Sequence, residues 1–477
     1  MNLIGLDVGT TSVKGLAVSE DGEVIASAEQ EYPLSTPRPG WSEQDPEDWW
    51  RATQVVLGKL SSDHPPTSIG LSGQMHGLVA LGAGDEVLRP AILWNDQRTG
   101  AQCAEIEASV GLERLIGLTG NRALTGFTAP KLLWLRDEEP ETFKRIESVL
   151  LPKDYVRLKL TGEKAMDPAD ASGTLLFDVA GRRWSHEVLD ALALPAEWLP
   201  PVLESGERAG ETSDGVPVAV GAGDQAAGAV GVGVMGAGGP LSVALGTSGV
   251  VFAALPEFAA EPEGRVHAFC HAVPGGWHAM GVMLSAAGSL RWLRDAMGAG
   301  ASFAEHVGEA DAWEAGVEGL TFLPYLAGER TPHADPDARG AFVGLSLRHD
   351  RGALTRAVLE GVAFGLRDSL DLMVGMGVEP VRARVSGGGA RSETWLQIIA
   401  SVLELPLERM AVDEGAAYGA ALLGGVAGGT FSDVEEAVGE CVRVTATVEP
   451  DPALVRAYAD LLPQFRALYP ALRSLRT

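Results

Sequence analysis

The sequence predicts an α/β protein of two related domains with a cleft between them, and three observations support this. The chain has 477 residues, more than a single hydrophobic core usually serves. A short turn of glycine and hydroxyl residues between two apolar strands occurs near the start of each half, in 3–18 and again in 241–253. Strand pairs and helical patterns follow both copies. We place the boundary in the glycine-rich stretch 236–240, which gives domains 1–238 and 239–477.

The first half begins with the strand, turn and strand of 3–18, and a further hairpin turn leads into a strand at 23–32. A helix is expected to start at Asp45-Pro46-Glu47-Asp48, because carboxylates favour a helix N-terminus. Further elements are predicted from apolar spacing. They are a strand at 68–71, helices near 98–110, 129–138 and 152–160, and a strand at 218–221.

The second half is predicted to contain a strand pair, a helix near 282–297, a long helix at 351–373, a strand at 381–385 and helices at 392–403 and 414–423. The last of these consists of small residues, which suits close packing. The uncharged run 226–256 is interrupted by glycines and Pro240, so we interpret it as a buried helix, a loop and a buried strand, not as a membrane span.

Composition limits the function classes. Hydrophobic residues make up 46% and charged residues 21% of the chain, as in ordinary globular proteins. The formal net charge of −27 argues against nucleic acid or an anionic membrane surface as a partner. The three cysteines, Cys103, Cys270 and Cys441, are far apart, which predicts neither a disulfide framework nor a metal cluster. With no signal-peptide pattern at the start, we expect a cytoplasmic protein.

The two glycine and hydroxyl turns are candidate phosphate sites. Backbone N–H groups and hydroxyls gathered in a tight turn suit phosphate oxygens. The first turn carries Gly9, Thr10 and Thr11 and the second carries Gly246 and Thr247, while Asp7 adds the carboxylate that a magnesium nucleotide needs. A strand follows each turn, which excludes the phosphate loop and the dinucleotide fingerprint, since both open a helix. An ordinary glycine-rich hairpin is the alternative for either copy alone.

Two further positions accompany the turns. Lys14 is either a point charge beside the phosphates or a solvent-facing residue on an edge strand. Gly387-Gly388-Gly389-Ala390 opens a helix and would let a planar ring approach the backbone, or it is a plain strand-to-helix turn.

Asp224 is the candidate reacting group. It follows an apolar strand and is preceded by glycine, at the expected mouth of the cleft, where a carboxylate could accept a proton from an attacking hydroxyl. Alternatively it caps a helix that begins at Gln225. The segments Gln74-Met75-His76 and 94–98 place hydrogen-bonding and apolar groups at loops after strands, as a polyhydroxylated ligand requires. Taken alone, His76 fits a core or loop histidine and 96–98 a helix start.

Together and in this order these motifs resemble the FGGY carbohydrate kinases of the actin-like ATPase superfamily, and within them the xylulokinases, over essentially the whole chain. The resemblance rests on four short motifs, Asp7-x-Gly-Thr-Thr-Ser-x-Lys14, Gly223-Asp-Gln-x-Ala227, Gly246-Thr-Ser248 and Gly387-Gly-Gly-Ala390. It also rests on the sequences of segments 73–77, 93–98 and 324–332. It implies two actin/ribonuclease H-like domains related by duplication, with an active-site cleft between them. Gln225 departs from the asparagine of many xylulokinases. Glycerol kinases carry an Arg-Glu pair where Met75-His76 stands, which disfavours glycerol.

The resemblance also implies roles. Asp224 would be the base that deprotonates a sugar hydroxyl, and Asp7 with Asp224 would hold Mg²⁺. The sugar would contact Gln74, Met75, His76, Asp224 and Gln225. ATP would contact Asp7, Gly9, Thr10, Thr11, Lys14, Gly246, Thr247, Gly388 and Gly389.

The expected activity is ATP-dependent phosphorylation of a ketopentose, foremost D-xylulose to D-xylulose 5-phosphate. D-ribulose, L-ribulose, a deoxy ketose or a polyol is the alternative substrate within the family. A switch ATPase like actin or the Hsp70 nucleotide domain is the alternative outside it. Family members are often dimers, so a homodimer is compatible with the resemblance.

Overall fold

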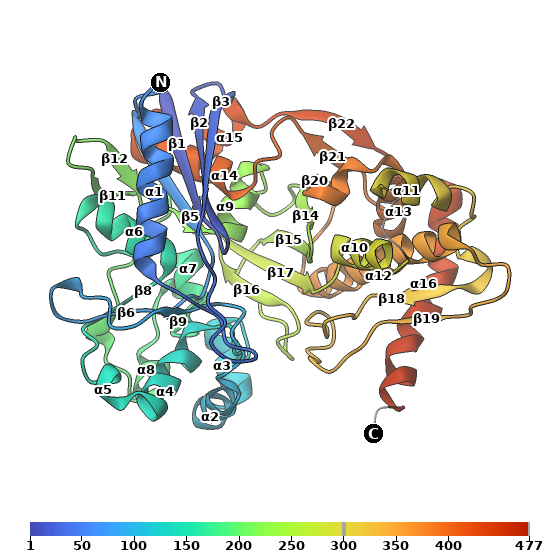
Figure 1. The fold of residues 1–477 in the computed structure, drawn as a ribbon, viewed down its shortest axis with the longest axis horizontal. Coiled ribbons are helices and arrows are strands. Elements are labelled where there is room, and N and C mark those ends of the chain that lie inside the picture. Colours follow the sequence, from blue (N-terminus) through green and yellow to red (C-terminus); the bar gives the residue numbers. More distant parts are fainter. Residues whose placement is uncertain (298–301, 476–477) are drawn as a thin grey trace.

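The computed structural model describes residues 1–297 and 302–475. Figure 1 shows two lobes side by side, the N-terminal half at the left in blue to green and most of the C-terminal half at the right in yellow to red. Each lobe is built on its own seven-stranded sheet. Among the described residues, no helix is long and apolar enough to cross a membrane.

The first half, 1–238, contains strands β1 to β13 and helices α1 to α9. Its strands are β1 (Asn2–Val8), β2 (Ser12–Ser19), β3 (Val24–Glu31), β4 (Glu43–Gln44), β5 (Ser68–Gly73), β6 (Val79–Leu81), β7 (Ala91–Ile92), β8 (Ser148–Leu150), β9 (Phe177–Asp178), β10 (Arg183–Trp184), β11 (Arg208–Glu211), β12 (Pro217–Ala219) and β13 (Ala222–Gly223). Its helices are α1 (Pro46–Ser61), α2 (Gly100–Val110), α3 (Leu112–Thr119), α4 (Thr128–Glu138), α5 (Pro140–Phe143), α6 (Pro152–Thr161), α7 (Pro168–Ser172), α8 (His186–Leu192) and α9 (Asp224–Gly231).

The second half contains strands β14 to β22 and helices α10 to α16. Its strands are β14 (Leu241–Leu245), β15 (Gly249–Leu255), β16 (His267–Cys270), β17 (Trp277–Met283), β18 (Thr321–Leu323), β19 (Ala341–Val343), β20 (Ala383–Ser386), β21 (Leu407–Met410) and β22 (Val444–Val448). Its helices are α10 (Ala287–Ala296), α11 (Phe303–Ala310), α12 (Arg351–Gly375), α13 (Glu393–Leu403), α14 (Ala416–Ala427), α15 (Val434–Cys441) and α16 (Pro452–Arg473).

The two large sheets repeat one topology. In the first, the order is β11-β12-β5-β1-β2-β3, with β13 also paired to β5. In the second it is β16-β17-β15-β14-β20-β21-β22. Each has an antiparallel three-strand meander, β1-β2-β3 or β14-β15-β17, and a parallel strand beside the first strand of that meander, β5 or β20. A second parallel strand, β12 or β21, comes next. This repeated topology agrees with the two actin/ribonuclease H-like domains that the resemblance implies, and the predicted duplication is confirmed.

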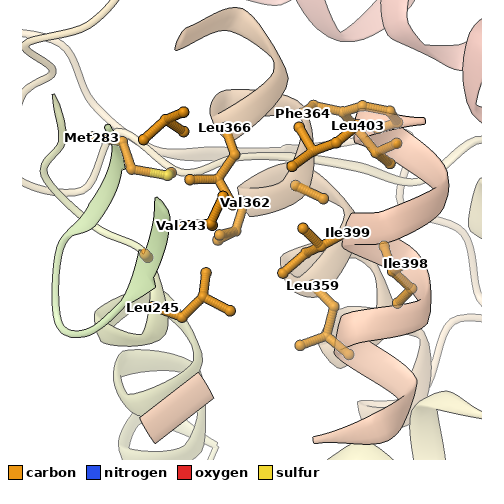
Figure 2. Close-up of a cluster of buried hydrophobic side chains, with 14 of the residues drawn as sticks. Val243, Leu245, Met283, Leu359, Val362, Phe364, Leu366, Ile398, Ile399 and Leu403 are labelled. Atoms are coloured by element: carbon orange, nitrogen blue, oxygen red, sulfur yellow. The ribbon is translucent and has the colours of Figure 1, made fainter. Parts of the chain in front are cut away.

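The second lobe packs its helices onto one face of its sheet. Val243 and Leu245 on β14 lie on the sheet side of the cluster in Figure 2, while Leu359 and Val362 on α12 and Ile399 on α13 complete it. All five are at most 1% exposed. The apolar spacing at 351–373 therefore correctly predicts the long helix that covers this sheet.

A helix of the second half packs on the sheet of the first. Helix α14 lies against β1, β5 and α9, and Figure 1 shows it with α15 near β2 and α9 in the left lobe. The approach is so close that a Cβ on Gly70 would lie 1.7 Å from the Ala420 carbonyl oxygen, and one on Gly419 would lie 1.8 Å from that of Ala227. The close packing predicted from the small residues of 414–423 is therefore confirmed. The helix itself runs from Ala416 to Ala427.

One predicted element is partly wrong. Residues 282–297 were expected to form a single helix, but β17 extends to Met283 and helix α10 begins only at Ala287. All but the first residue of β17 are buried, so the strand lacks the alternation that would have distinguished it from a buried helix. Between the strand and the helix the chain forms hydrogen bonds to the second glycine and hydroxyl turn. The backbone amides of Ala286 and Gly288 donate to the Thr247 carbonyl at 2.9 and 3.1 Å.

Candidate active site

The first glycine and hydroxyl turn joins β1 to β2. The Gly9 amide donates to the Ser12 carbonyl at 3.0 Å, and the Tyr32 hydroxyl donates to the carbonyls of both Gly9 and Ser12. Thr10 is half-buried and Thr11 is exposed. The turn is therefore held from its inner side while its threonines remain accessible, as a phosphate site requires.

Gln74, expected to contact the sugar, lies under this turn instead. Its amide nitrogen donates to the Gly9 carbonyl at 3.2 Å and to the Gln44 side chain at 3.0 Å, and its oxygen accepts from the Thr10 hydroxyl at 3.4 Å. The residue is 2% exposed. In this arrangement Gln74 positions the candidate phosphate turn and does not line the neighbouring cavity.

Lys14 is not on an edge strand, since β2 lies between β1 and β3. It pairs in register with Asp7, and its charge lowers the pKa of that carboxyl. Its ammonium also forms an ion pair with Glu414, just before α14. The side chain thus stands beside the first turn and links the two halves of the chain.

The second turn joins β14 to β15 and rests on the start of α10. The Gly246 carbonyl accepts from the Ala287 amide at 2.9 Å, and Thr247 and Ser248 are exposed. Because β20 runs parallel to β14, the Gly387–Ala390 turn at its carboxyl end lies beside the second candidate phosphate turn. Both predicted nucleotide motifs of the second half therefore share one edge of its sheet.

Within the Gly387–Ala390 turn the glycines differ. Gly387 has a φ of +85°, and its amide donates to the Asp413 carboxylate at 3.2 Å. A Cβ on Gly388 would meet nothing within 4 Å, so this residue borders open space. A Cβ on Gly389 would lie 2.8 Å from that of Leu245, so Gly389 is required for close packing of the turn on β14.

Asp7 and Asp224 meet at the carboxyl edge of the first sheet. Strands β1, β5 and β13 are parallel in register, so Asp7 near the end of β1 and Asp224 after β13 project from the same edge. The Ser72 hydroxyl donates to Asp7 Oδ1 at 3.2 Å. Burial raises the pKa of Asp7 to about 6. Burial, then repulsion from Asp7, raises the pKa of Asp224 to about 7.

Asp224 is also the first residue of α9, with Gly223 before it at the cap position. The alternative in which Asp224 caps a helix starting at Gln225 therefore does not describe the structure. Hydrogen bonds from the backbone and side chain of Gln225 still lower the pKa of Asp224, opposing part of the effect of burial. The helix N-terminus holds the carboxylate in place without removing it from the cavity.

A cavity of about 250 Å³ lies between the two lobes next to Asp224. Its volume suits a small ligand. It is lined by Met75, His76, Trp94, Leu124, Gly126, Phe127, Asp224, Gln225, Ser248, Val250, Met280, Val282 and Arg330. Of the five residues predicted to contact a sugar, the structure brings together all except Gln74.

His76 presents a neutral imidazole to this cavity. Its φ is +68°, a conformation that a residue other than glycine seldom adopts and that often marks a functional site. Its ring Nδ1 donates to the Gly173 carbonyl at 2.8 Å, which leaves Nε2 as an acceptor. Burial, helped by the charge of Lys131, lowers the pKa of His76 to about 3. The Lys131 ammonium in turn donates to the His76 carbonyl at 2.8 Å.

The segment 94–98 divides between the cavity and a buried ion cluster. Trp94 lines the cavity, and its indole N–H donates to the Thr10 hydroxyl at 3.0 Å, so it connects the cavity to the first candidate phosphate turn. Arg98 instead pairs with Asp96 at 2.6 Å and Glu43 at 2.7 Å, with Trp41 stacked at 3.6 Å. Arg98 therefore supports the loop from outside the cavity.

The prediction missed two polar lining residues, Ser248 and Arg330, and also the lining residues Leu124, Gly126, Phe127, Val250, Met280 and Val282. Ser248 belongs to the predicted second turn, so its position after Thr247 was the available signal. Arg330 belongs to the motif 324–332, which supported the family resemblance, but no function was predicted for its residues. Only the fold brings that loop to β17 and into the cavity: the Thr331 amide donates to the Val282 carbonyl at 3.0 Å.

The donor set fits a magnesium nucleotide. Two carboxylates that repel each other would be stabilised by a cation between them. No group of three or more histidine, cysteine, aspartate or glutamate residues suited to a metal occurs in the parts of the chain that the structure describes. Mg²⁺ commonly uses one or two carboxylates and takes its other ligands from water and phosphate oxygens, so Asp7 and Asp224 would suffice.

Comparison with known proteins places this site in a family. Residues 2–231 match the N-terminal domain, and residues 241–428 the C-terminal domain, of the FGGY family of carbohydrate kinases. The xylulose kinase of Escherichia coli K12 is 44% identical over 485 residues, covering 99% of each chain. A crystal structure named a xyloylose kinase, from Brucella ovis, is 43% identical with a TM-score of 0.94 and full coverage of both chains.

A further solved structure has the same fold and a different name. The gluconate kinase of Lactobacillus acidophilus is 27% identical with a TM-score of 0.94, and the alignment covers 99% of this chain and 98% of that one. The family matches together cover most of the chain, and close relatives align over nearly all of it. The chain therefore belongs to the FGGY family of carbohydrate kinases and is an ATP-dependent carbohydrate kinase.

Proposed function

We propose that this kinase transfers the γ-phosphoryl group of ATP to D-xylulose, giving D-xylulose 5-phosphate and ADP. The relatives named xylulose kinases, at 44% and 43% identity over essentially the whole chain, support this choice of sugar. The observation that carries the chemistry is Asp224, a carboxylate with a pKa of about 7 on the wall of the interlobe cavity. A base works best when its pKa lies near the working pH.

In this mechanism Asp224 accepts the proton of the sugar's terminal hydroxyl. That oxygen forms a bond to the γ-phosphorus, and the bond between this phosphorus and the β–γ bridging oxygen breaks, so ADP leaves. Asp224 then returns its proton to solvent. The turns at 9–11 and 246–248 would hold the phosphates from opposite lobes, and Gly388 would lie against the adenosine. Mg²⁺, held by Asp7 and Asp224, would neutralise phosphate charge.

His76 and Gln225 would orient the sugar. Since His76 Nε2 is an acceptor at neutral pH, it would take a hydrogen bond from a sugar hydroxyl. Gln225 both donates and accepts, and Met75 would form an apolar wall. Water excluded from the closed site would no longer compete with the sugar for ATP.

The test of the substrate is ATP consumption with Mg²⁺ and a panel of D-xylulose, D-ribulose, L-ribulose, L-xylulose, glycerol and no sugar. We expect kcat/KM for D-xylulose to exceed that of each other sugar by about tenfold or more, which corresponds to about 1.4 kcal/mol. A preference for another sugar would keep the kinase and refute the proposed substrate. Hydrolysis of ATP at one rate under all conditions would refute the mechanism.

The test of the base is Asp224→Asn, which keeps the size of the side chain and removes its charge. We expect kcat to fall by about 10²- to 10⁴-fold, the usual contribution of a general base. Asp214→Asn, in the exposed turn between β11 and β12, is the control and should keep the original rate. A near-normal rate in Asp224→Asn would exclude Asp224 as the base.

A further inference from the structure

The loop that carries Arg330 is fixed against strand β17. The Val282 amide donates to the Thr331 hydroxyl at 3.1 Å, and the Thr331 amide donates to the Val282 carbonyl at 3.0 Å. One residue earlier, the Glu329 carboxyl accepts from the Leu284 amide at 2.9 Å and from the Arg330 amide at 2.8 Å. These bonds on both sides of Arg330 direct its side chain into the cavity that contains His76 and Asp224.

The guanidinium of Arg330 has no partner in that cavity. Among residues 1–297 and 302–475, no side-chain hydrogen bond or ion pair to it is formed. Burial lowers its pKa, and attraction to the Glu329 carboxyl, which already accepts from two backbone amides, opposes this effect. By contrast, Arg98, which lies outside the cavity lining, has two carboxylate partners. Leaving a cation poorly solvated without a partner is unfavourable, so an unpaired guanidinium on the wall of a substrate cavity indicates a group that it binds.

Arg330 and His76 line the same cavity. Its charge helps to lower the pKa of His76 and of His267, but it is not among the groups that shift the pKa of Asp224. The cavity lining therefore offers two chemically distinct sets of groups. One includes Asp224, the proposed base; the other is an acceptor, His76 Nε2, and a set of donors, the Arg330 guanidinium.

We propose that Arg330 is a substrate-binding and specificity residue whose guanidinium donates hydrogen bonds to the carbonyl oxygen of the ketose. This inference rests on the proposed function. In a 2-ketopentose the carbonyl lies toward the opposite end of the chain from the terminal hydroxyl that is phosphorylated. A ketone oxygen only accepts hydrogen bonds and a guanidinium only donates them, so the two match. With His76 accepting from a hydroxyl, Arg330 fixes which end of the sugar faces Asp224.

The test compares D-xylulose with its two C2-reduced products, xylitol and D-arabinitol, in wild type and Arg330→Met. We expect kcat/KM for D-xylulose to fall by about 10- to 100-fold, the range for a hydrogen bond to a charged group. Activity on either pentitol should change by less than about threefold, because neither offers the carbonyl. The KM for ATP should stay within about twofold and the circular dichroism spectrum unchanged, which shows that the variant is folded.

Two further variants distinguish binding from structural support. In Arg330→Ala, guanidinium ion at low millimolar concentration should restore part of the D-xylulose activity, because the ion can occupy the vacated position. Arg265→Met is the matched control: it removes a guanidinium from the same region, but one that pairs with Glu261 and lies outside the cavity lining. Its selectivity for ketose over pentitol should equal that of wild type.

The outcomes separate this inference from the proposed function. If wild type prefers D-xylulose and Arg330→Met keeps the same preference over both pentitols, Arg330 does not bind the carbonyl and the kinase assignment stands. If wild type uses no ketose but phosphorylates a sugar acid such as gluconate, and Arg330→Met abolishes this, the guanidinium binds a carboxylate. In that case both the ketose proposal and the carbonyl role are wrong.

Discussion

Two carboxyl groups, those of Asp7 and Asp224, hold protons in the folded ligand-free protein that they would release in the unfolded chain. Their ordinary pKa is 3.8, and the fold raises it to about 6 and about 7. Between about pH 4 and pH 7 the folded state therefore binds more protons than the unfolded state, so stability falls as pH rises through this interval. At pH 8 Asp224 of the wild type is largely ionised, and Asp224→Asn removes that buried charge, so we expect this variant to melt a few degrees higher than wild type. At pH 4 Asp224 is protonated, and we expect the variant to melt no higher than wild type.

The measurement is thermal unfolding without nucleotide or metal at pH 4 to 8, with Asp214→Asn as the exposed control. Magnesium nucleotide should then raise the melting temperature of wild type more than that of Asp224→Asn, because the cation neutralises the same repulsion. Equal melting temperatures for wild type and Asp224→Asn at every pH would mean that Asp224 is not under electrostatic strain, and would weaken its assignment as a raised-pKa base.

At the scale of elements, the contact of α14 with β5 depends on the absence of side chains. A Cβ on Gly70 would overlap the Ala420 carbonyl, a backbone atom that cannot move without displacing the helix. We expect Gly70→Ala to lower the free energy of unfolding by about 3 kcal/mol or more, toward the upper range for overpacking. Gly58→Ala is the matched control, since Gly58 lies exposed on α1 with nothing within 4 Å of its added Cβ.

That control should gain about 0.5–1 kcal/mol, because alanine favours a helix over glycine. Chemical denaturation of the three proteins measures both effects. A Gly70→Ala protein as stable as wild type would show that α14 can shift away from the sheet at little cost.

Elements were predictable where one physical signal dominated. Apolar spacing predicted α12. The carboxylates of 45–48 predicted the start of α1, which begins at Pro46 with Asp45 as its cap. The site was predictable where function imposes a local pattern, as at 7–12 and 246–248. It was not predictable where a residue's surroundings come from distant segments. Gln74 turns to Gly9 and Gln44, and Arg330 reaches the cavity only because its loop pairs with β17.

At the scale of the whole molecule, the two lobes of the structure do not coincide with the two halves of the sequence. Helices α14 and α15 follow the boundary at 238 in sequence, yet their apolar residues join one cluster with Leu3, Leu16 and Ala227 of the first half. The ion pair between Lys14 and Glu414 lies at the same junction. The first sheet therefore has one face completed by the second half of the chain.

It follows that residues 1–238 expressed alone should not unfold cooperatively, because the face of β1 and β5 that α14 covers would be exposed to water. Joining residues 411–442 to 1–238 through a flexible linker restores α14 and α15, and this fusion should regain a cooperative thermal transition. Circular dichroism melting of the fragment, the fusion and the full chain measures the difference. If residues 1–238 alone melt cooperatively near the melting temperature of the full chain, α14 is not required for the stability of the first lobe. The expected result instead makes α14 a structural element of the first lobe that the second half of the chain supplies, because α14 packs on β1, β5 and α9.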